Sequence, residues 1–203
     1  MKENFIDDEK LPMLKKEVND LQHKPKISIL LPVYNTNIDF LHSTIESVLK
    51  QVYQNWELCI SDDHSSDEMV KNVIKNYVNS DSRIKVVYRS EKGLISACSN
   101  SALDLASGEF VALLNHDDFL SVDALFHVAK SLIVNKHLDL IYSDEDKIDE
   151  TGKHSDPHFK PDWCPDNFLS RNYLGHLVII RKSLMDLIGG FREGFEGSQD
   201  FDL

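Results

Sequence analysis

The segment Ile27-Ser-Ile-Leu-Leu-Pro-Val-Tyr-Asn35 is a short apolar run that ends in polar residues. A run of this length, followed by turn-forming residues, is typical of a buried strand. Similar runs follow at residues 57–61, 84–88, 110–114 and 138–143, with helical spacing of apolar residues between most of them, at 40–52, 69–78, 94–106 and 122–134. Ser65 and Glu68 have the spacing of a capping box, so we expect Ser65 to cap the second helix. The alternation predicts an α/β fold in which helices flank a mainly parallel central sheet.

The chain has 203 residues, of which 41% are hydrophobic, and a formal net charge of −12. This is enough apolar sequence for one sizeable core, so we expect one domain at residues 26–203 after a helical lead-in at residues 1–25. A strongly acidic chain repels phosphate backbones, which argues against a nucleic-acid partner. A nucleoside diphosphate would be repelled too, unless a cation or a few basic side chains offset the carboxylates.

The lack of a recognisable targeting signal and the pattern of cysteines favour a cytoplasmic protein. The longest apolar runs fall far short of the roughly 18 residues that span a bilayer, so no transmembrane segment is expected. Residues 1–21 lack the continuous apolar stretch of a secretory signal. Cys59, Cys98 and Cys164 form no CxxC pair, and we expect them to be buried thiols rather than disulfides.

Acidic residues follow three of the predicted strands, at residues 62–67, 115–118 and 144–146. In an open α/β sheet, ligands bind outside the carboxyl ends of the strands. Any one of these clusters would suit a solvated turn that caps a helix. Because the three clusters should converge on one edge of the sheet, we expect a binding site there.

The sequence contains no glycine-rich loop of the kind that binds phosphates. Neither GxGxxG nor GxxxxGK followed by Ser or Thr occurs, which argues against a dinucleotide dehydrogenase and a P-loop ATPase. We therefore expect Mn²⁺ or Mg²⁺, which prefers one or two carboxylates plus substrate phosphates, with Asp117 and Asp118 as candidate ligands. Zinc is the weaker alternative, because His154, His158 and Cys164 lack the paired spacing of zinc sites.

Several motifs, in the same order along the chain, resemble family 2 glycosyltransferases. They are Ile29-Leu-Leu-Pro-Val-Tyr-Asn35, Cys59-Ile-Ser-Asp-Asp63, Lys92-Gly-Leu-Ile-Ser-Ala97 through Asn100, and Ser107-Gly-Glu-Phe-Val-Ala-Leu-Leu-Asn-His-Asp-Asp118. Five later segments resemble those of a subgroup of the family that builds bacterial surface polysaccharides. They are Tyr142-Ser-Asp-Glu-Asp-Lys147, Phe159-Lys-Pro-Asp-Trp163, Asn172-Tyr-Leu-Gly-His176, Gly189-Gly-Phe-Arg192 and Gly197-Ser-Gln-Asp-Phe-Asp-Leu203. The resemblance spans residues 26–203 and implies a GT-A fold.

The resemblance also implies a nucleoside-diphosphate sugar donor, with UDP favoured, and transfer with inversion to a glycan or lipid-linked acceptor. Pro32 and Tyr34 match the wall of the nucleoside pocket, and Asp62 matches the residue that hydrogen-bonds the base. Further donor contacts are implied at Gly93, Asn100, Asn115, His116 and Asp117. Asp117 matches the metal ligand that bridges both phosphates, with Asp118 as an auxiliary carboxylate.

Asp200 matches the general base of the family, which takes the proton of the acceptor hydroxyl. From the residues alone, an N-cap of a final helix is the competing interpretation of Asp200. Contacts to the acceptor or the donor sugar are expected at Asp144, Glu145, Asp146, Trp163, His176 and Arg192. The competing interpretations are structural: a solvated loop for the three acids, a loop anchor for Trp163, and a buried histidine before an apolar strand at 177–180.

Two features depart from the family pattern. Asn115 occupies the first position of the DxD metal motif, so one charge is missing, and the chain stops at Leu203 in what resembles the first turn of a helix. We therefore expect a C-terminally incomplete domain, and the alternative function is a non-catalytic nucleotide-sugar-binding fragment of a longer synthase. A nucleotidyltransferase ranks below both, since residues 33–36 hold no glycine-rich basic loop. The implied location is cytoplasmic, with peripheral association at the inner face of a membrane left open.

Overall fold

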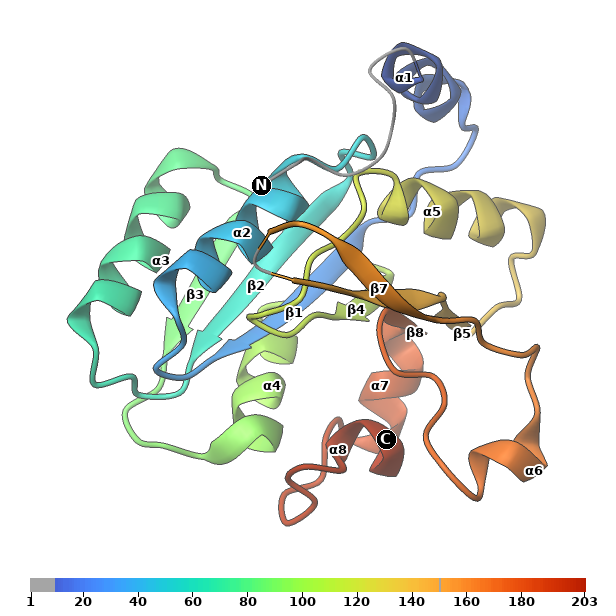
Figure 1. Cartoon of the computed structure of the whole chain (residues 1–203). Helices are drawn as coiled ribbons and strands as arrows, with labels where there is room; N and C mark the ends of the chain where they lie inside the picture. The colour runs from blue at the N-terminus through green and yellow to red at the C-terminus, as the bar shows by residue number, and fades with distance from the viewer. Residues whose placement is uncertain (1–9, 150) are drawn as a thin grey trace.

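The computed structural model describes residues 10–149 and 151–203. Its central sheet has six strands in the order β3-β2-β1-β4-β8-β5 (Figure 1). β1 to β4 are parallel, and β8 pairs antiparallel with both β4 and β5, so β5 runs in the same direction as β4. The strands are β1 Ile27–Val33, β2 Trp56–Asp62, β3 Ile84–Tyr88, β4 Phe110–Leu113, β5 Leu140–Tyr142 and β8 Val178–Arg181. The expected α/β fold with a mainly parallel sheet is confirmed.

Helices cover both faces of the sheet (Figure 1). One face packs against α1 Leu11–Asp20, α2 Ile38–Leu49, α3 Glu68–Ser80 and α5 Ala124–Val134. The other face packs against α4 Leu94–Asp104 and α7 Lys182–Ile188. Two single-turn helices complete the second half of the chain, α6 Pro165–Phe168 and α8 Gln199–Asp202. Within residues 10–149 and 151–203, no helix is long and apolar enough to cross a membrane.

The apolar residues of β1 contribute to both cores. Ile29 and Leu31 belong to the larger core under α2 and α5, whereas Leu30 between them belongs to the smaller core under α4. Successive side chains of a strand point to opposite faces, so a strand covered on both sides carries apolar residues on both faces. Full burial of each such side chain contributes about 1.5–3 kcal/mol.

A separate antiparallel hairpin follows β5. It consists of β6 Glu145–Ile148 and β7 His154–His158, and Figure 1 shows it in front of the sheet in that view. The apolar patterns of the sequence predict no strand at these residues. Their side chains are mostly exposed and polar, so the hairpin carries no alternation of apolar and polar residues to reveal it.

The expected capping box at the start of the second helix is wrong. α3 begins at Glu68, and its N-cap is Asp67, whose side chain accepts a hydrogen bond from Met69 N at 2.8 Å. Ser65 serves a different loop, because its Oγ accepts from the backbone N–H of Asn35 at 2.9 Å. Asp is at least as good an N-cap as Ser, so the acceptor nearer the helix takes the role. Of the predicted lead-in, α1 is helical, and residues 1–9 lie outside the described residues.

The opposite edge of the sheet, at the amino ends of the strands, holds a buried carboxylate. Glu57 on β2 is 2% exposed, and it lies 2.5 Å from Lys26 Nζ and 2.9 Å from Lys85 Nζ. Ser28 Oγ donates to it at 2.7 Å, and Ser107 N donates at 2.6 Å. Burial by itself raises the pKa of Glu57, but these partners outweigh burial and hold the pKa well below its usual range. Glu57 therefore stays ionised inside the fold.

Candidate functional site

A cavity of about 390 Å³ opens at the carboxyl edge of the sheet. Its wall crosses the ends of three neighbouring strands, from Asp63 after β2, over Tyr34 after β1, to Asp117 after β4. Five residues predicted to bind the donor line it, namely Pro32, Tyr34, Asn115, His116 and Asp117. Two of the three acidic clusters expected to converge therefore contribute to one cavity, through Asp63 and Asp117, whereas none of residues 144–146 lines it.

Lys92 also lines the cavity, although it was not among the predicted site residues. Its Nζ lies 3.9 Å from the centroid of the Tyr34 ring, within the range of a cation–π contact. The signal was present in the sequence, because Lys92 is a basic residue between a predicted strand and the helix expected at 94–106. Lys92 brings a positive charge to a cavity that otherwise carries carboxylates.

Asp62 ends β2 and Asp63 follows it, and only one of these two aspartates lines the cavity. Asp62 is 1% exposed and does not line the cavity, and its Oδ2 accepts from Ser65 N at 3.2 Å. Asp63 lines the cavity instead. Neighbouring residues along an extended chain face opposite ways, so the two side chains differ in what they contact. The structure therefore places Asp63 in the cavity, whereas the residue predicted to contact the base, Asp62, is buried away from it.

Asp63 also holds the loop before α4. Its Oδ1 accepts from Gly93 N at 2.8 Å, its Oδ2 accepts from Leu94 N at 2.9 Å, and Arg89 Nε lies 2.9 Å from Oδ1. Gly93 was expected to contact the donor, and its backbone N–H is used for this hydrogen bond. A Cβ at Gly93 would lie 2.8 Å from that of Ala97, so the close approach at the start of α4 requires glycine.

The turn after β4 carries the candidate metal ligands. Asn115, His116 and Asp117 line the cavity, whereas Asp118 does not. His116 Nδ1 lies 2.7 Å from Thr36 Oγ1, which ties this turn to the loop after β1. Asp118 Oδ2 is buried and has no hydrogen-bond partner among the described residues. Burial raises the pKa of the Asp118 carboxyl above its usual value, and Asp117 adds to this rise while His176 opposes it.

A cation at this turn would need ligands from outside the protein. Among residues 10–149 and 151–203, no three His, Cys, Asp or Glu side chains are grouped closely enough to hold a metal ion by themselves. Asp117, Asp118 and the amide of Asn115 nevertheless offer oxygen atoms, and one oxygen of Asp118 is buried without a hydrogen bond. Such a set fits a hard cation that shares its coordination with bound phosphates.

The three acidic residues predicted to contact the acceptor pair with residues of β7 and of the segment that follows it. Asp144 Oδ1 accepts from Lys160 N at 2.8 Å, and Asp146 Oδ2 lies 2.7 Å from His154 Nδ1. Glu145 Oε1 lies 3.1 Å from His158 Nδ1. Burial by itself raises the pKa of Glu145, but its hydrogen bonds hold the pKa below the usual value.

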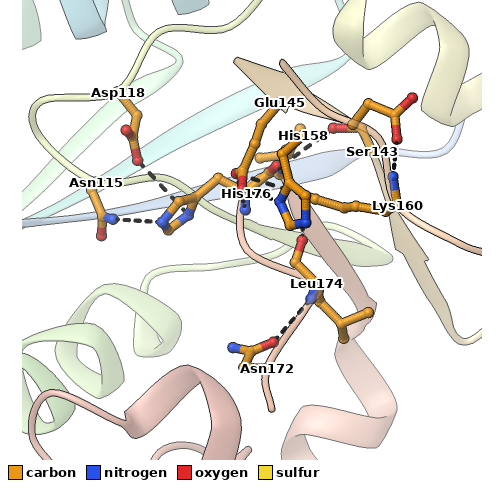
Figure 2. Close-up of polar contacts among 11 residues, drawn as sticks. Asn115, Asp118, Ser143, Glu145, His158, Lys160, Asn172, Leu174 and His176 are labelled. Atoms are coloured by element: carbon orange, nitrogen blue, oxygen red, sulfur yellow. Dashed lines mark hydrogen bonds and ion pairs between the residues drawn. The ribbon is translucent and has the colours of Figure 1, made fainter. Parts of the chain in front are cut away.

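His176 connects this hairpin to the turn after β4 (Figure 2). Its backbone N–H donates to Glu145 Oε2 at 2.7 Å, and its ring Nε2 lies 3.3 Å from Asn115 Nδ2. The ring Nδ1 lies 3.8 Å from Asp118 Oδ2. The structure thus places His176 beside the candidate metal ligands.

Asn100 is placed away from the donor cavity. Its Nδ2 donates to Phe191 O at 2.8 Å, and its Oδ1 accepts from Phe191 N at 2.8 Å. A Cβ at Gly190 would lie 2.5 Å from Asn100 Oδ1, so this contact also requires glycine. The side chain of Asn100 therefore fastens the segment that leads towards Asp200 onto α4.

Asp200 lies in α8, beside the donor cavity. It lines a small adjoining cleft together with Pro32 and Asn115, which also line the donor cavity. The N-cap of α8 is Ser198, so the alternative interpretation of Asp200 as the N-cap is wrong. Gln199, which precedes Asp200, is 9% exposed and lines the donor cavity itself.

Two further predicted contacts surround α8. Arg192 pairs with Asp202 and thereby ties the preceding glycine-rich loop to this helix. Trp163 is 57% exposed and packs on Phe168, whose ring centroid lies 5.2 Å from that of Phe201 in α8. An exposed aromatic surface therefore lies next to Asp200 in the fold.

Known proteins are similar to this chain in sequence and in fold. The sequence model described as Glycosyl transferase family 2 matches residues 28–189. The chain is 47% identical over 186 residues to the uncharacterized protein y4gI of Sinorhizobium fredii, and 37% identical over 183 residues to the O-antigen biosynthesis protein RfbC of Myxococcus xanthus. These alignments cover 92% and 90% of this chain but only 20% and 14% of the two relatives.

Solved structures agree with the sequence matches. The crystal structure of S. aureus TarS in complex with UDP resembles this chain with a TM-score of 0.69 at 22% sequence identity. The match covers 87% of this chain and 53% of that chain. This likeness confirms the expected GT-A fold.

Proposed function

Because this chain belongs to glycosyl transferase family 2, we propose that it transfers a sugar from a nucleoside-diphosphate sugar, with UDP favoured, and inverts the anomeric carbon. The acceptor is a glycan or a lipid-linked saccharide in polysaccharide synthesis, a setting supported by the name of the relative RfbC. The single cavity that runs from Asp63 past Tyr34 to Asp117 supports this proposal best, because it offers a base contact, a ring and a phosphate end in one row.

The nucleoside belongs at the end of the cavity formed by β1 and β2. A carboxylate has about four acceptor positions, and Asp63 uses two of them for the hydrogen bonds from Gly93 N and Leu94 N, while Arg89 lies beside it as an ion-pair partner. Acceptor positions are therefore left for the imide N–H of a uracil base. The Tyr34 ring supplies a face for the base or ribose, and a base stacked on an aromatic ring gains about 1–3 kcal/mol. UDP in the TarS complex makes the same nucleotide the first choice here.

The diphosphate belongs at the end formed by the turn after β4. Asp117 and Asp118 would hold Mn²⁺ or Mg²⁺ together with the phosphate oxygens, and Lys92 adds a positive charge to the same cavity. When bound, the cation supplies Lewis-acid stabilisation of the charge that develops on the departing diphosphate. Without such compensation the carboxylates of this acidic chain would repel the donor.

Asp200 is the proposed general base. An acceptor hydroxyl is a weak nucleophile until a carboxylate takes its proton, and help of this kind typically raises rates about 10²- to 10⁴-fold. The Asp200 side chain lines a cleft that shares Pro32 and Asn115 with the donor cavity, so it can meet a hydroxyl that approaches the donor sugar. Attack from the side opposite the diphosphate gives the proposed inversion.

Thermal unfolding with UDP, dTDP, GDP and CDP, each with and without Mn²⁺, tests the donor site. A ligand that binds only the native state stabilises it by about 2.7 kcal/mol at a hundredfold excess over its Kd. For a domain of this size, that corresponds to a rise in Tm of about 5–10 °C. We expect Mn²⁺-dependent stabilisation by UDP. Stabilisation by GDP alone would exclude the uracil assignment, and no shift with any nucleotide would refute the donor site.

A non-catalytic donor-binding protein is the second candidate. The observation that favours it is Asn115, which replaces a carboxylate in the metal motif and whose amide lies 3.3 Å from a ring nitrogen of His176. Release of UDP from a panel of UDP-sugars, measured by a coupled assay in the presence of Mn²⁺, separates the two candidates. Turnover supports the transferase, whereas tight donor binding with no UDP release over hours supports the binding protein.

A further inference from the structure

Lys160 follows the hairpin and is almost completely buried, although the proposed transfer uses none of its atoms. Its side chain is 1% exposed, and its Nζ donates hydrogen bonds to Leu174 O and, at 2.7 Å, to His176 O. Glu145 Oε2 lies 3.6 Å from the same Nζ. A buried ammonium group is costly unless it is paired and hydrogen-bonded, so this placement needs a structural or functional reason.

Glu145 binds the same backbone segment, around His176, through a backbone N–H group rather than a carbonyl oxygen. Its Oε2 accepts from the backbone N–H of His176 at 2.7 Å, while Lys160 donates to the carbonyl oxygen of His176. Gly175 has a φ of +49°, and a Cβ there would lie 2.6 Å from Glu145 Oε1. The segment therefore approaches the carboxylate so closely that glycine is required at this position. Figure 2 shows Glu145 and Lys160 converging on the backbone around His176.

The imidazole held in this way faces the turn that carries the candidate metal ligands. The ring Nε2 of His176 lies 3.3 Å from Asn115 Nδ2. Its Nδ1 lies 3.8 Å from Asp118 Oδ2, the buried oxygen without a hydrogen-bond partner among the described residues. His176 thus contacts both ends of the turn from residue 115 to residue 118.

We propose that Lys160 and Glu145 are positioning residues, which grip both peptide groups of His176 and set its imidazole against Asn115 and Asp118. In this way they orient the turn that binds the donor diphosphate. Outer hydrogen-bond partners of this kind fix the orientation of the groups that contact a ligand or a metal. The inference rests on the proposed nucleoside-diphosphate donor for its functional consequence, but the clamp itself is testable without a ligand.

The ligand-free test follows the histidine ring signals of the chain by NMR, with the His176 signal identified from its loss in His176→Ala. Lys160→Met removes the ammonium group and keeps most of the apolar stem. Lys147→Met is the matched control, because Lys147 lies on the hairpin that precedes Lys160, has a 76% exposed side chain and pairs only with the exposed Asp156 among the contacts described. We expect Lys160→Met to shift or broaden the His176 ring signal and Lys147→Met to leave it unchanged. An unchanged signal in Lys160→Met overturns the proposal.

The functional test compares two probes, UDP with Mn²⁺ and uridine, by calorimetry at a temperature where all variants are folded. Loss of hydrogen bonds to a charged group predicts UDP binding weakened about tenfold or more in Lys160→Met. Uridine, which lacks the diphosphate, should bind with unchanged affinity. His176→Ala should weaken UDP binding similarly, and Lys160→Met should add little when it is combined with His176→Ala.

The pattern of losses separates positioning from general damage. Equal weakening of uridine and UDP, or fully additive losses in the double variant, would overturn the clamp. If Lys160→Met does not fold, Glu145→Gln provides the same cycle, because it keeps the side-chain shape and removes the charge that holds the His176 N–H. A wild-type chain that binds no UDP would refute the proposed donor, while the ring signals would still decide the clamp.

Discussion

Replacing Glu57 by glutamine should destabilise the sheet without affecting the donor cavity. The carboxylate accepts hydrogen bonds from Ser28 and Ser107 and pairs with Lys26 and Lys85. Glutamine keeps the size of the side chain but turns an amide N–H₂ group towards one of these donors. Breaking a buried ion pair costs about 3–5 kcal/mol. The two lysines are each 38% exposed and can be rehydrated, so we expect a loss near the lower end, about 3 kcal/mol.

Urea and thermal unfolding at pH 7 measure this loss. A decrease of about 3 kcal/mol lowers the Tm of a domain of this size by about 6–12 °C. The control is Glu17→Gln, because Glu17 pairs with Lys130 at the surface, with side chains 43% and 54% exposed, and such pairs contribute about 0–1 kcal/mol. UDP affinity should be unchanged in Glu57→Gln, since the cavity lies at the opposite ends of the strands. A loss in Glu57→Gln no larger than that in Glu17→Gln would refute the reasoning.

The same pair of proteins gives a prediction about pH. The pKa of Glu57 is lower in the folded protein than in the unfolded chain, so its stabilisation is complete above the unfolded pKa and is lost as pH falls towards the folded pKa. The difference in unfolding free energy between wild type and Glu57→Gln should therefore be constant near neutral pH and shrink below about pH 4.3. Urea unfolding from pH 7 to pH 3 checks this, and a difference that stays constant over the range would contradict it.

Four further outcomes follow from the site. Asp200→Asn should retain UDP affinity and lower UDP release from a UDP-sugar with acceptor by about 10²- to 10⁴-fold, whereas the exposed Asp186→Asn should leave turnover unchanged; equal turnover in the two variants would remove Asp200 as the base. Tyr34→Ala should weaken the binding of uridine and of UDP by the same factor, because both lose the stacking contact. For 1–3 kcal/mol of stacking the loss is about 5- to 150-fold in affinity, measured by calorimetry. An effect on UDP alone would place the ring away from the nucleoside. Mn²⁺ should bind weakly to the chain alone and much more tightly with UDP present, a gain that Asp117→Asn abolishes; tight Mn²⁺ binding without nucleotide, seen by electron paramagnetic resonance, would contradict a shared cation site. Asn100→Ala should cost about 1–3 kcal/mol of unfolding free energy and lower turnover more than UDP affinity, because it frees the segment that leads to Asp200; a variant with reduced UDP affinity and normal turnover would argue against this role.

The layout of the sheet illustrates how far local patterns reach. The mainly apolar runs near residues 27–33, 57–61 and 84–88 correspond to β1, β2 and β3, and β1 and β2 are almost fully buried because helices cover both faces of the sheet. The hairpin of β6 and β7 was not predicted, since two exposed polar strands leave no periodicity. The insertion of β8 between β4 and β5 was not predicted either, because strand order is a long-range property.

The residues after the strands show the same limit at finer scale. The acidic clusters after β2 and β4 were expected at one edge, and Asp63 and Asp117 do line one cavity there. Asp62, which was predicted to contact the base, does not line this cavity, and its neighbour Asp63 does. Glu57 was hidden inside an apparently apolar run, and its partners Lys26 and Lys85 come from distant positions in the chain.

The α/β class, the family and the polar residues at the carboxyl ends of the strands can be recognised from the amino-acid sequence. These properties depend on the order of residues along the chain, through local periodicity and motif spacing. Three contacts are visible only in the folded chain: Asp63 faces the cavity, Asn100 fastens the segment before Asp200, and Lys160 and Glu145 hold the backbone of His176. These contacts join residues far apart in sequence, and the direction of each side chain is decided by how the elements pack against one another.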